Sequence, residues 1–81
     1  MSAPEARVVV LTRVGCHLCD VAKEAMARVA EKTGLAWQEI DVDSDPQLQE
    51  EYWDRVPVIL LDGKEHGYWR VEEERLLRDL A

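Results

Sequence analysis

Continuous apolar runs mark two positions along the chain. The run from Val8 to Leu11 predicts a strand over residues 6–11, and the run from Val58 to Leu61 predicts a second over residues 57–61. Strands that are apolar on both faces are covered on both sides, so both are expected at the centre of a sheet. Residues 36–42 alternate between polar and apolar, which is typical of a half-exposed edge strand.

A period of three to four residues follows the first strand. Apolar residues at this spacing predict one buried stripe on an amphipathic helix that ends at Thr33-Gly34. The stripe comprises Leu18, Val21, Ala22, Ala25, Met26, Val29 and Ala30. Because strand, helix and strand occupy about 35 residues, the first two strands should be parallel with a right-handed crossover.

The second half of the chain predicts a short helix, a hairpin and a last helix. Ser44-Asp45-Pro46 is a helix start, and Pro57 limits that helix; Leu48, Tyr52 and Trp53 are expected to face inward. Asp62-Gly63 predicts a two-residue turn into an antiparallel strand over residues 65–69. A helix beginning near Glu72 then buries Leu76, Leu77 and Leu80. The predicted order is βαβ-α-ββα, an α/β fold in one domain over residues 1–81.

Composition narrows the class of protein. The chain has 81 residues, 47% hydrophobic and 33% charged, as expected of an ordinary globular domain. A net charge of −7 argues against nucleic acid, whose phosphates require a basic face. No apolar run is long enough to span a membrane, and the first residues do not resemble a secretory signal. We therefore expect a cytoplasmic monomer without membrane or nucleic-acid partners.

Cys16 and Cys19 carry the candidate chemistry. They stand three residues apart at the start of the first predicted helix, where i and i+3 are neighbours. C-x-x-C next to a βαβ pattern indicates a dithiol redox pair, and the helix N-terminus favours a thiolate at Cys16. Two other interpretations remain at this point, inert core cysteines and half of a zinc site. A c-type haem site is excluded because Asp20 replaces the histidine of C-x-x-C-H.

The chain resembles the glutaredoxin-type domains of the thioredoxin-fold superfamily, in particular the short bacterial glutaredoxin-like family. Residues 13–19 are similar to that family's basic residue, two spacers and C-x-x-C, and Val56-Pro57 matches its cis-proline before the third strand. The resemblance covers residues 7–80. It implies a minimal thioredoxin fold, with a four-stranded mixed sheet flanked by three helices.

The resemblance also implies a function. The chain would be a thiol–disulfide oxidoreductase in which Cys16 attacks a substrate disulfide and Cys19 resolves the mixed disulfide. Substrate-binding residues would be Arg13, His17, Val56, Pro57 and Trp69. No metal or prosthetic group is required, and glutathione is the candidate co-substrate. Expected partners are protein or small-molecule disulfides, with glutathione or a thioredoxin reductase-type system as the reductant.

Two departures from the family pattern affect the prediction. His17-Leu18 stands between the cysteines where dithiol glutaredoxins usually have Pro-Tyr, and residues 67–72 contain one glycine and two aromatics where the family has Gly-Gly. Since side-chain bulk there obstructs close backbone approach, we expect weak glutathione binding. Two alternatives stay open: a binding module of the same fold without turnover, and metal or iron–sulfur binding through Cys16 and Cys19 of two chains.

Overall fold

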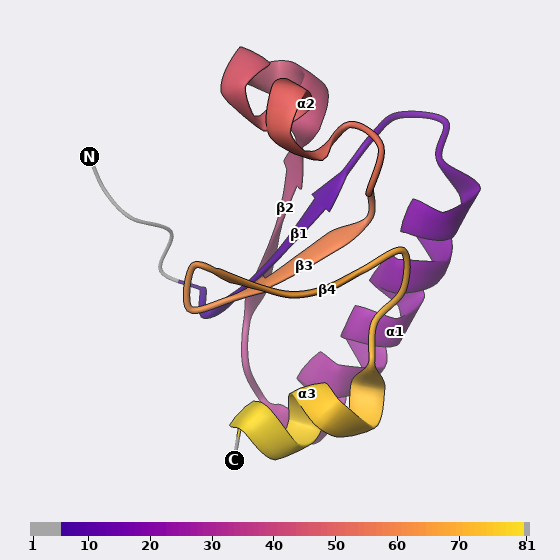
Figure 1. Ribbon diagram of the computed structural model, residues 1–81. Coiled ribbons are helices and arrows are strands. Elements are labelled where there is room, and N and C mark those ends of the chain that lie inside the picture. Colours follow the sequence, from indigo (N-terminus) through magenta and orange to yellow (C-terminus); the bar gives the residue numbers. More distant parts are fainter. Residues whose placement is uncertain (1–5, 81) are drawn as a thin grey trace.

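A four-stranded mixed sheet forms the centre of the structure, a computed structural model that describes residues 6–80 (Figure 1). The strands are β1 (Val8–Thr12), β2 (Trp37–Asp41), β3 (Val58–Leu61) and β4 (Lys64–Tyr68), in the sheet order β2-β1-β3-β4. β1 is parallel to β2, whereas β3 is antiparallel to both β1 and β4. All four predicted strands are confirmed, with boundaries that differ by one or two residues.

Three helices accompany the sheet: α1 (His17–Thr33), α2 (Pro46–Tyr52) and α3 (Glu73–Leu80). The side chain of Asp45 caps α2 by accepting the N–H of Gln47, with Pro46 in the first turn, as predicted. A 3₁₀ turn, η1 (Val42–Ser44), precedes α2 and was not predicted. The predicted minimal thioredoxin fold is confirmed. Within residues 6–80, no helix has the length and apolar content needed to cross a membrane.

The hairpin between β3 and β4 has the predicted turn. Asp62 and Gly63 both have positive φ, 53° and 83°, and Leu61 pairs with Lys64 across them. This combination matches the right-handed twist of the two strands.

The core has two layers because β1 and β3 are covered on both faces. On one face, α1 and α3 pack over a buried cluster of Val8, Val10, Met26, Val29, Ile59 and Leu76. On the other, η1 and α2 help to cover Val9, Leu11, Val42 and Val58. All five residues of β1 are buried, which is why its sequence is apolar throughout.

Three residues predicted to face inward are exposed instead. Leu18 and Val21 are 49% and 45% exposed, and Trp53 is 57% exposed. The buried stripe of α1 consists of Cys19, Ala22, Ala25, Met26 and Val29. Val21 lies at the margin of that stripe, and Leu18 lies in the first turn at the free end of the helix. Helical periodicity identifies a face of α1 but not how far along that face the packing continues.

Candidate functional site

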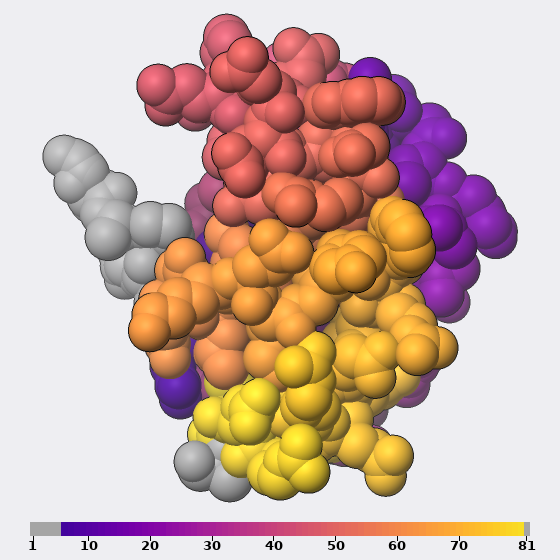
Figure 2. Space-filling model, viewed as in Figure 1, coloured from indigo at the N-terminus to yellow at the C-terminus, as the bar shows by residue number. Residues whose placement is uncertain are grey.

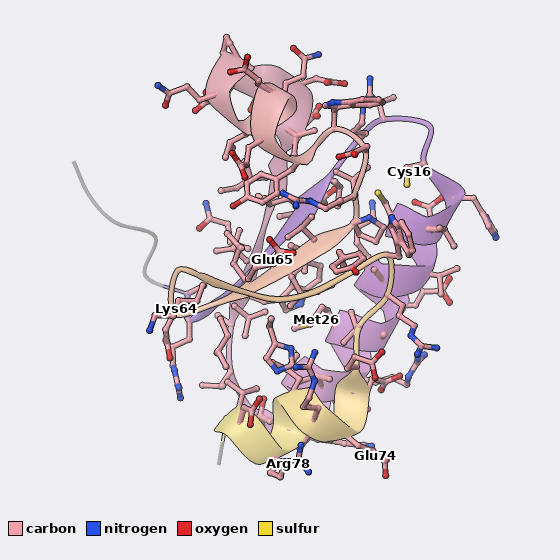
Figure 3. The ribbon with its side chains drawn as sticks, viewed as in Figure 1. Cys16, Met26, Lys64, Glu65, Glu74 and Arg78 are labelled. Atoms are coloured by element: carbon pink, nitrogen blue, oxygen red, sulfur yellow. The ribbon has the colours of Figure 1, made fainter. Side chains whose placement is uncertain are left out.

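Three chain segments meet at one end of the sheet. Val58 pairs with Leu11 of β1 on one side and with Tyr68 of β4 on the other. The segment after β1, the segment before β3 and the segment after β4 therefore leave the sheet at the same end. Cys16 lies at the same end, at the start of α1 (Figure 3). The register thus brings residues 13–19, 56–57 and 69 of the predicted site to one end of the fold.

Cys16 is held at the beginning of α1 by a tight turn and a cap. Gly15 has a φ of 80°, a left-handed conformation that a residue with a Cβ adopts at a cost. Cys16 follows in an extended conformation as the N-cap residue, and its Sγ accepts the backbone N–H of Cys19 over 3.2 Å. A sulfur in this position receives an N–H that the helix leaves unpaired, and the helix dipole favours negative charge there. Cys16 is half-buried, so part of this residue is exposed at the helix start.

Cys19 has the opposite environment. Its residue is 2% exposed, and burial raises the pKa of its thiol to about 12. Burial is the largest cause of this raised pKa; the hydrogen bond with the Cys16 side chain and the charges of Cys16 and Asp20 act in the same direction, whereas the backbone N–H of Arg13 acts against them. The pair is therefore asymmetric, with one half-buried cysteine and one shielded thiol that holds its proton.

The segment before β3 lies at the same end of the sheet as Cys16. The bond between Val56 and Pro57 is cis, as predicted from the resemblance. Pro57 is buried, and its carbonyl oxygen accepts the backbone N–H of Trp69 over 2.6 Å. Val56 is half-buried against the cluster beneath α2. The predicted residues Val56, Pro57 and Trp69 thus form one connected group.

Trp69 has an uncommon conformation. Its φ is 71°, in the left-handed region that residues with a side chain rarely adopt, and it is 54% exposed. The indole Nε1 donates to the carbonyl oxygen of Asp54 over 3.4 Å, and the ring meets Tyr68 edge-on with centroids 5.0 Å apart. The backbone and the indole therefore both connect the end of β4 to the segment before β3.

Arg13 and His17 complete the predicted set. Arg13 is paired with Asp43 of η1, with 3.3 Å between Nε and Oδ2, so its guanidinium already has a carboxylate partner. His17 is the first residue of α1 and is exposed. Two partners of site residues were not predicted from the sequence: Asp43, which pairs with Arg13, and the carbonyl oxygen of Asp54, which accepts from Trp69. The position of Asp43 just after β2 was a signal for the first, because parallel β1 and β2 end together.

Metal ligands are few at this site. Among residues 6–80, no three His, Cys, Asp or Glu side chains gather as a candidate metal site. Cys16 and Cys19 supply two thiols, and a tetrahedral site requires four ligands.

Fold and site together define a small glutaredoxin-like domain of the thioredoxin-fold class. Residues 7–81 match the family described as Glutaredoxin-like domain (DUF836), and the chain belongs to that family. The match supports the resemblance that residues 13–19 and Val56-Pro57 carried in the sequence.

Proteins of similar length resemble this chain over most of their sequence. The chain is 44% identical to the uncharacterized protein Rv0508 of Mycobacterium tuberculosis, with 100% of this chain and 87% of that protein covered. Among solved structures, it is similar to protein XcR50 of X. campestris, with 35% identity, a TM-score of 0.72, and 90% and 93% of the two chains covered. Protein Ne2328 of Nitrosomonas europaea gives 25% identity, a TM-score of 0.80, and coverage of 100% and 98%.

Proposed function

We propose that this protein is a dithiol thiol–disulfide oxidoreductase with Cys16 as nucleophile and Cys19 as resolving cysteine. The observation that carries the proposal is the asymmetry of the pair: a half-buried cysteine that caps α1, and a buried thiol whose pKa is about 12. Only a thiolate attacks a disulfide efficiently, so the two cysteines are suited to different steps.

In the first step, the Cys16 thiolate attacks one sulfur of a substrate disulfide. A bond forms between Cys16 and that sulfur, the substrate S–S bond breaks, and the other substrate sulfur leaves as a thiolate. The helix N-terminus stabilises the attacking sulfur before the bond forms. The backbone of Val56, beside cis-Pro57, would pair with the bound substrate.

The second step depends on a change at Cys19. Once Cys16 is in a mixed disulfide, it carries no negative charge, so two of the causes that raise the pKa of Cys19 are removed. Burial still raises the pKa of Cys19, but its thiol now loses the proton more readily than before and attacks the Cys16 sulfur as a thiolate. A Cys16–Cys19 disulfide forms, and the second substrate sulfur leaves as a thiolate. The substrate gains two electrons and the protein loses two, which an external thiol, from glutathione or a thioredoxin reductase-type system, must restore.

Two cysteine variants test this assignment. Cys16→Ser should abolish reduction of a model disulfide such as hydroxyethyl disulfide. Cys19→Ser should instead accumulate a mixed disulfide at Cys16, detected as added mass in non-reducing mass spectrometry. Circular dichroism of both variants checks that they fold. A Cys16→Ser variant that keeps its activity would refute the assignment, and a wild-type protein without reductase activity would leave a binding module of the same fold. We further propose that the reaction takes place in the cytoplasm, where thiols are kept reduced and a C-x-x-C pair is more often catalytic than structural.

A further inference from the structure

Exposed apolar side chains gather around the cysteine end of the fold. Among residues 6–80, the large apolar residues that are substantially exposed are Val14, Leu18, Val21, Trp53, Tyr68 and Trp69. Val14 precedes α1, Leu18 and Val21 lie in its first two turns, Trp53 follows α2, and Tyr68 and Trp69 lie at the end of β4. In Figure 2, the start of α1, the segment before β3 and the turn after β4 adjoin on one side of the molecule. We call these six residues the apolar collar. Exposed large apolar side chains that gather at one end of a fold indicate an interaction surface.

The collar is presented to solvent by specific contacts. The N–H of Trp69 is bonded to Pro57, and its indole is bonded to the Asp54 carbonyl, so the ring is fixed across the segment before β3. Val14 is 87% exposed in the turn that leads to Cys16, and Leu18 is 49% exposed between the cysteines. The apolar surface therefore adjoins the nucleophile on both sides of it in the sequence.

Two open hollows flank the collar, and each contains one of its tryptophans. The first, about 520 Å³, is lined by residues of β4 and the turn into α3, including Trp69. The second, about 530 Å³, is lined by Arg13, Pro46, Gln49, Glu50 and Trp53. Two hollows, each beside an exposed tryptophan, suit side chains that project from an extended segment.

Most basic side chains near this end already have partners within the protein. Arg75, which lines the first hollow, donates to the carbonyl oxygen of His66. Arg13 is paired with Asp43, Lys23 with Asp20 and Glu39, Arg55 with Glu51 and Glu65, and Arg70 with Glu72. Carboxylates of Glu50 and Asp54 are also exposed here, and the chain has a net charge of −7. The surface therefore favours a ligand with positive charge and offers little to the two carboxylates of glutathione.

We propose that the preferred substrate is a protein disulfide within an extended apolar segment flanked by basic residues, and that glutathione is disfavoured. This inference rests on the proposed function and names the substrate class of the same site. The apolar side chains next to the disulfide contact the collar, and the flanking basic residues lie near Glu50 and Asp54. Cys16 then attacks the disulfide as described above, with the same transfer of two electrons.

The test uses the full-length reduced protein and four peptides of equal length. Each peptide carries one cysteine joined by a disulfide to 2-mercaptoethanol, and the set combines apolar or polar neighbours with basic or acidic flanks. Oxidised glutathione and hydroxyethyl disulfide complete the substrates. Rates are measured by acid quench and chromatography, and each is divided by the rate with hydroxyethyl disulfide. We expect the apolar–basic peptide to react about tenfold or more faster than the polar–acidic peptide and oxidised glutathione.

Variants connect the preference to the collar. Leu18→Ser, Trp53→Ala and Trp69→Ala should each lower the normalised rate of the apolar–basic peptide several-fold toward that of the polar–acidic peptide. Ala27→Ser, an exposed position of α1 outside the collar, is the matched control and should keep the preference. Equal normalised rates for all substrates, or glutathione as the fastest, would overturn this inference while the reductase function stands. A protein that reduces none of them, hydroxyethyl disulfide included, would overturn the proposed function itself.

Discussion

The backbone N–H of Cys19 donates to the Sγ atom of Cys16 over 3.2 Å, so the resolving residue stabilises the sulfur that it later attacks. Cys19 stays protonated because burial, and to a smaller extent the neighbouring negative Cys16 sulfur, raise the pKa of its thiol. Formation of a mixed disulfide at Cys16 removes that negative charge. The geometry therefore orders the two proposed steps in time.

Alkylation should distinguish the two thiols. With reduced protein near neutral pH, iodoacetamide should modify Cys16 at least about a hundredfold faster than Cys19, since only thiolates react and Cys19 is both buried and protonated. Peptide mapping by mass spectrometry after timed quenching gives both rates. Denatured protein is the control, in which the two rates should converge. Equal rates in the folded protein would contradict the assigned roles.

The pKa of Cys19 also predicts how stability depends on pH. In the unfolded chain this thiol loses its proton near pH ~8.5, whereas in the folded protein it does so near pH 12. Between these values the unfolded state binds fewer protons, so the free energy of unfolding falls as pH rises. Below pH ~8.5 the contribution is fully present.

Denaturant unfolding under reducing conditions measures this contribution. The reduced wild type should lose stability between pH 8.5 and 10.5 more steeply than Cys19→Ala, by at most about 1.4 kcal/mol per pH unit. Since the alanine variant has no thiol to titrate at this position, it is the reference. Parallel curves for the two proteins would show that Cys19 titrates normally in the folded state.

The sequence was sufficient for the fold where local patterns and tertiary packing agree. The continuous apolar run at Val8–Leu11 predicts a strand covered on both faces, and all of β1 is buried. Asp62-Gly63 predicts a tight turn because both residue types tolerate the positive φ that the turn requires. Asp45 and Pro46 determine the start of α2 for equally local reasons. η1 could not be predicted, because it depends on the hydrogen bonds that Asp41 makes at the end of β2.

The sequence predicted the key residues of the candidate site but not which apolar side chains around them are exposed. Cys16, Cys19 and Pro57 stood out because each has a distinctive residue type at a distinctive position. Leu18 and Trp53 were assigned to the core because apolar residues usually are buried, and the sequence does not reveal where packing stops. They are exposed because, once the chain has folded, no described element packs over them at this end of the sheet. The ion pair that occupies Arg13 likewise depends on how β2 ends beside β1.

Leu76 should be the anchor of α3. It is fully buried in the cluster that α1 and α3 share, so Leu76→Ala should lower the free energy of unfolding by about 2–5 kcal/mol. Leu77 is only half-buried on the same helix, and Leu77→Ala is therefore the matched control with a smaller loss. Urea unfolding followed by circular dichroism measures both. A larger loss for Leu77→Ala would mean that α3 packs with a different face.

Trp69 predicts a reversal of the usual order of alanine and glycine. At most positions a protein with glycine is less stable than the same protein with alanine. At Trp69, however, a φ of 71° is unfavourable for any residue with a Cβ. Both Trp69→Ala and Trp69→Gly lose the hydrogen bond from the indole Nε1 to the Asp54 carbonyl. The difference between their free energies of unfolding therefore measures the cost of the left-handed backbone conformation alone. Trp69→Gly should be more stable than Trp69→Ala by about 1 kcal/mol, measured by urea unfolding. The opposite order would show that this residue relaxes out of the left-handed region.

Glutathione binding should be weak, for reasons of shape and charge. Trp69 and Tyr68 place two exposed rings at the end of β4, where bulk prevents close approach to the backbone. The N-terminus of α3 would otherwise suit a carboxylate, but Glu73 and Glu74 occupy its first turn, and Glu72 precedes it. Glu72 is paired with Arg70 and Glu73 with Arg28, so the exposed Glu74 contributes most of the repulsion. A nearby like charge in a partly solvated site disfavours a ligand carboxylate by on the order of 1 kcal/mol.

Oxidised glutathione titrated against Cys19→Ser, followed by NMR and by mass spectrometry, should therefore give small shifts and little mixed disulfide below millimolar concentration. A disulfide peptide with an apolar sequence and basic flanks, added to the same variant, should give more mixed disulfide at equal concentration. Saturation by glutathione in the micromolar range, with shifts at Val56 and residues 68–72, would show that these side chains leave room for the ligand.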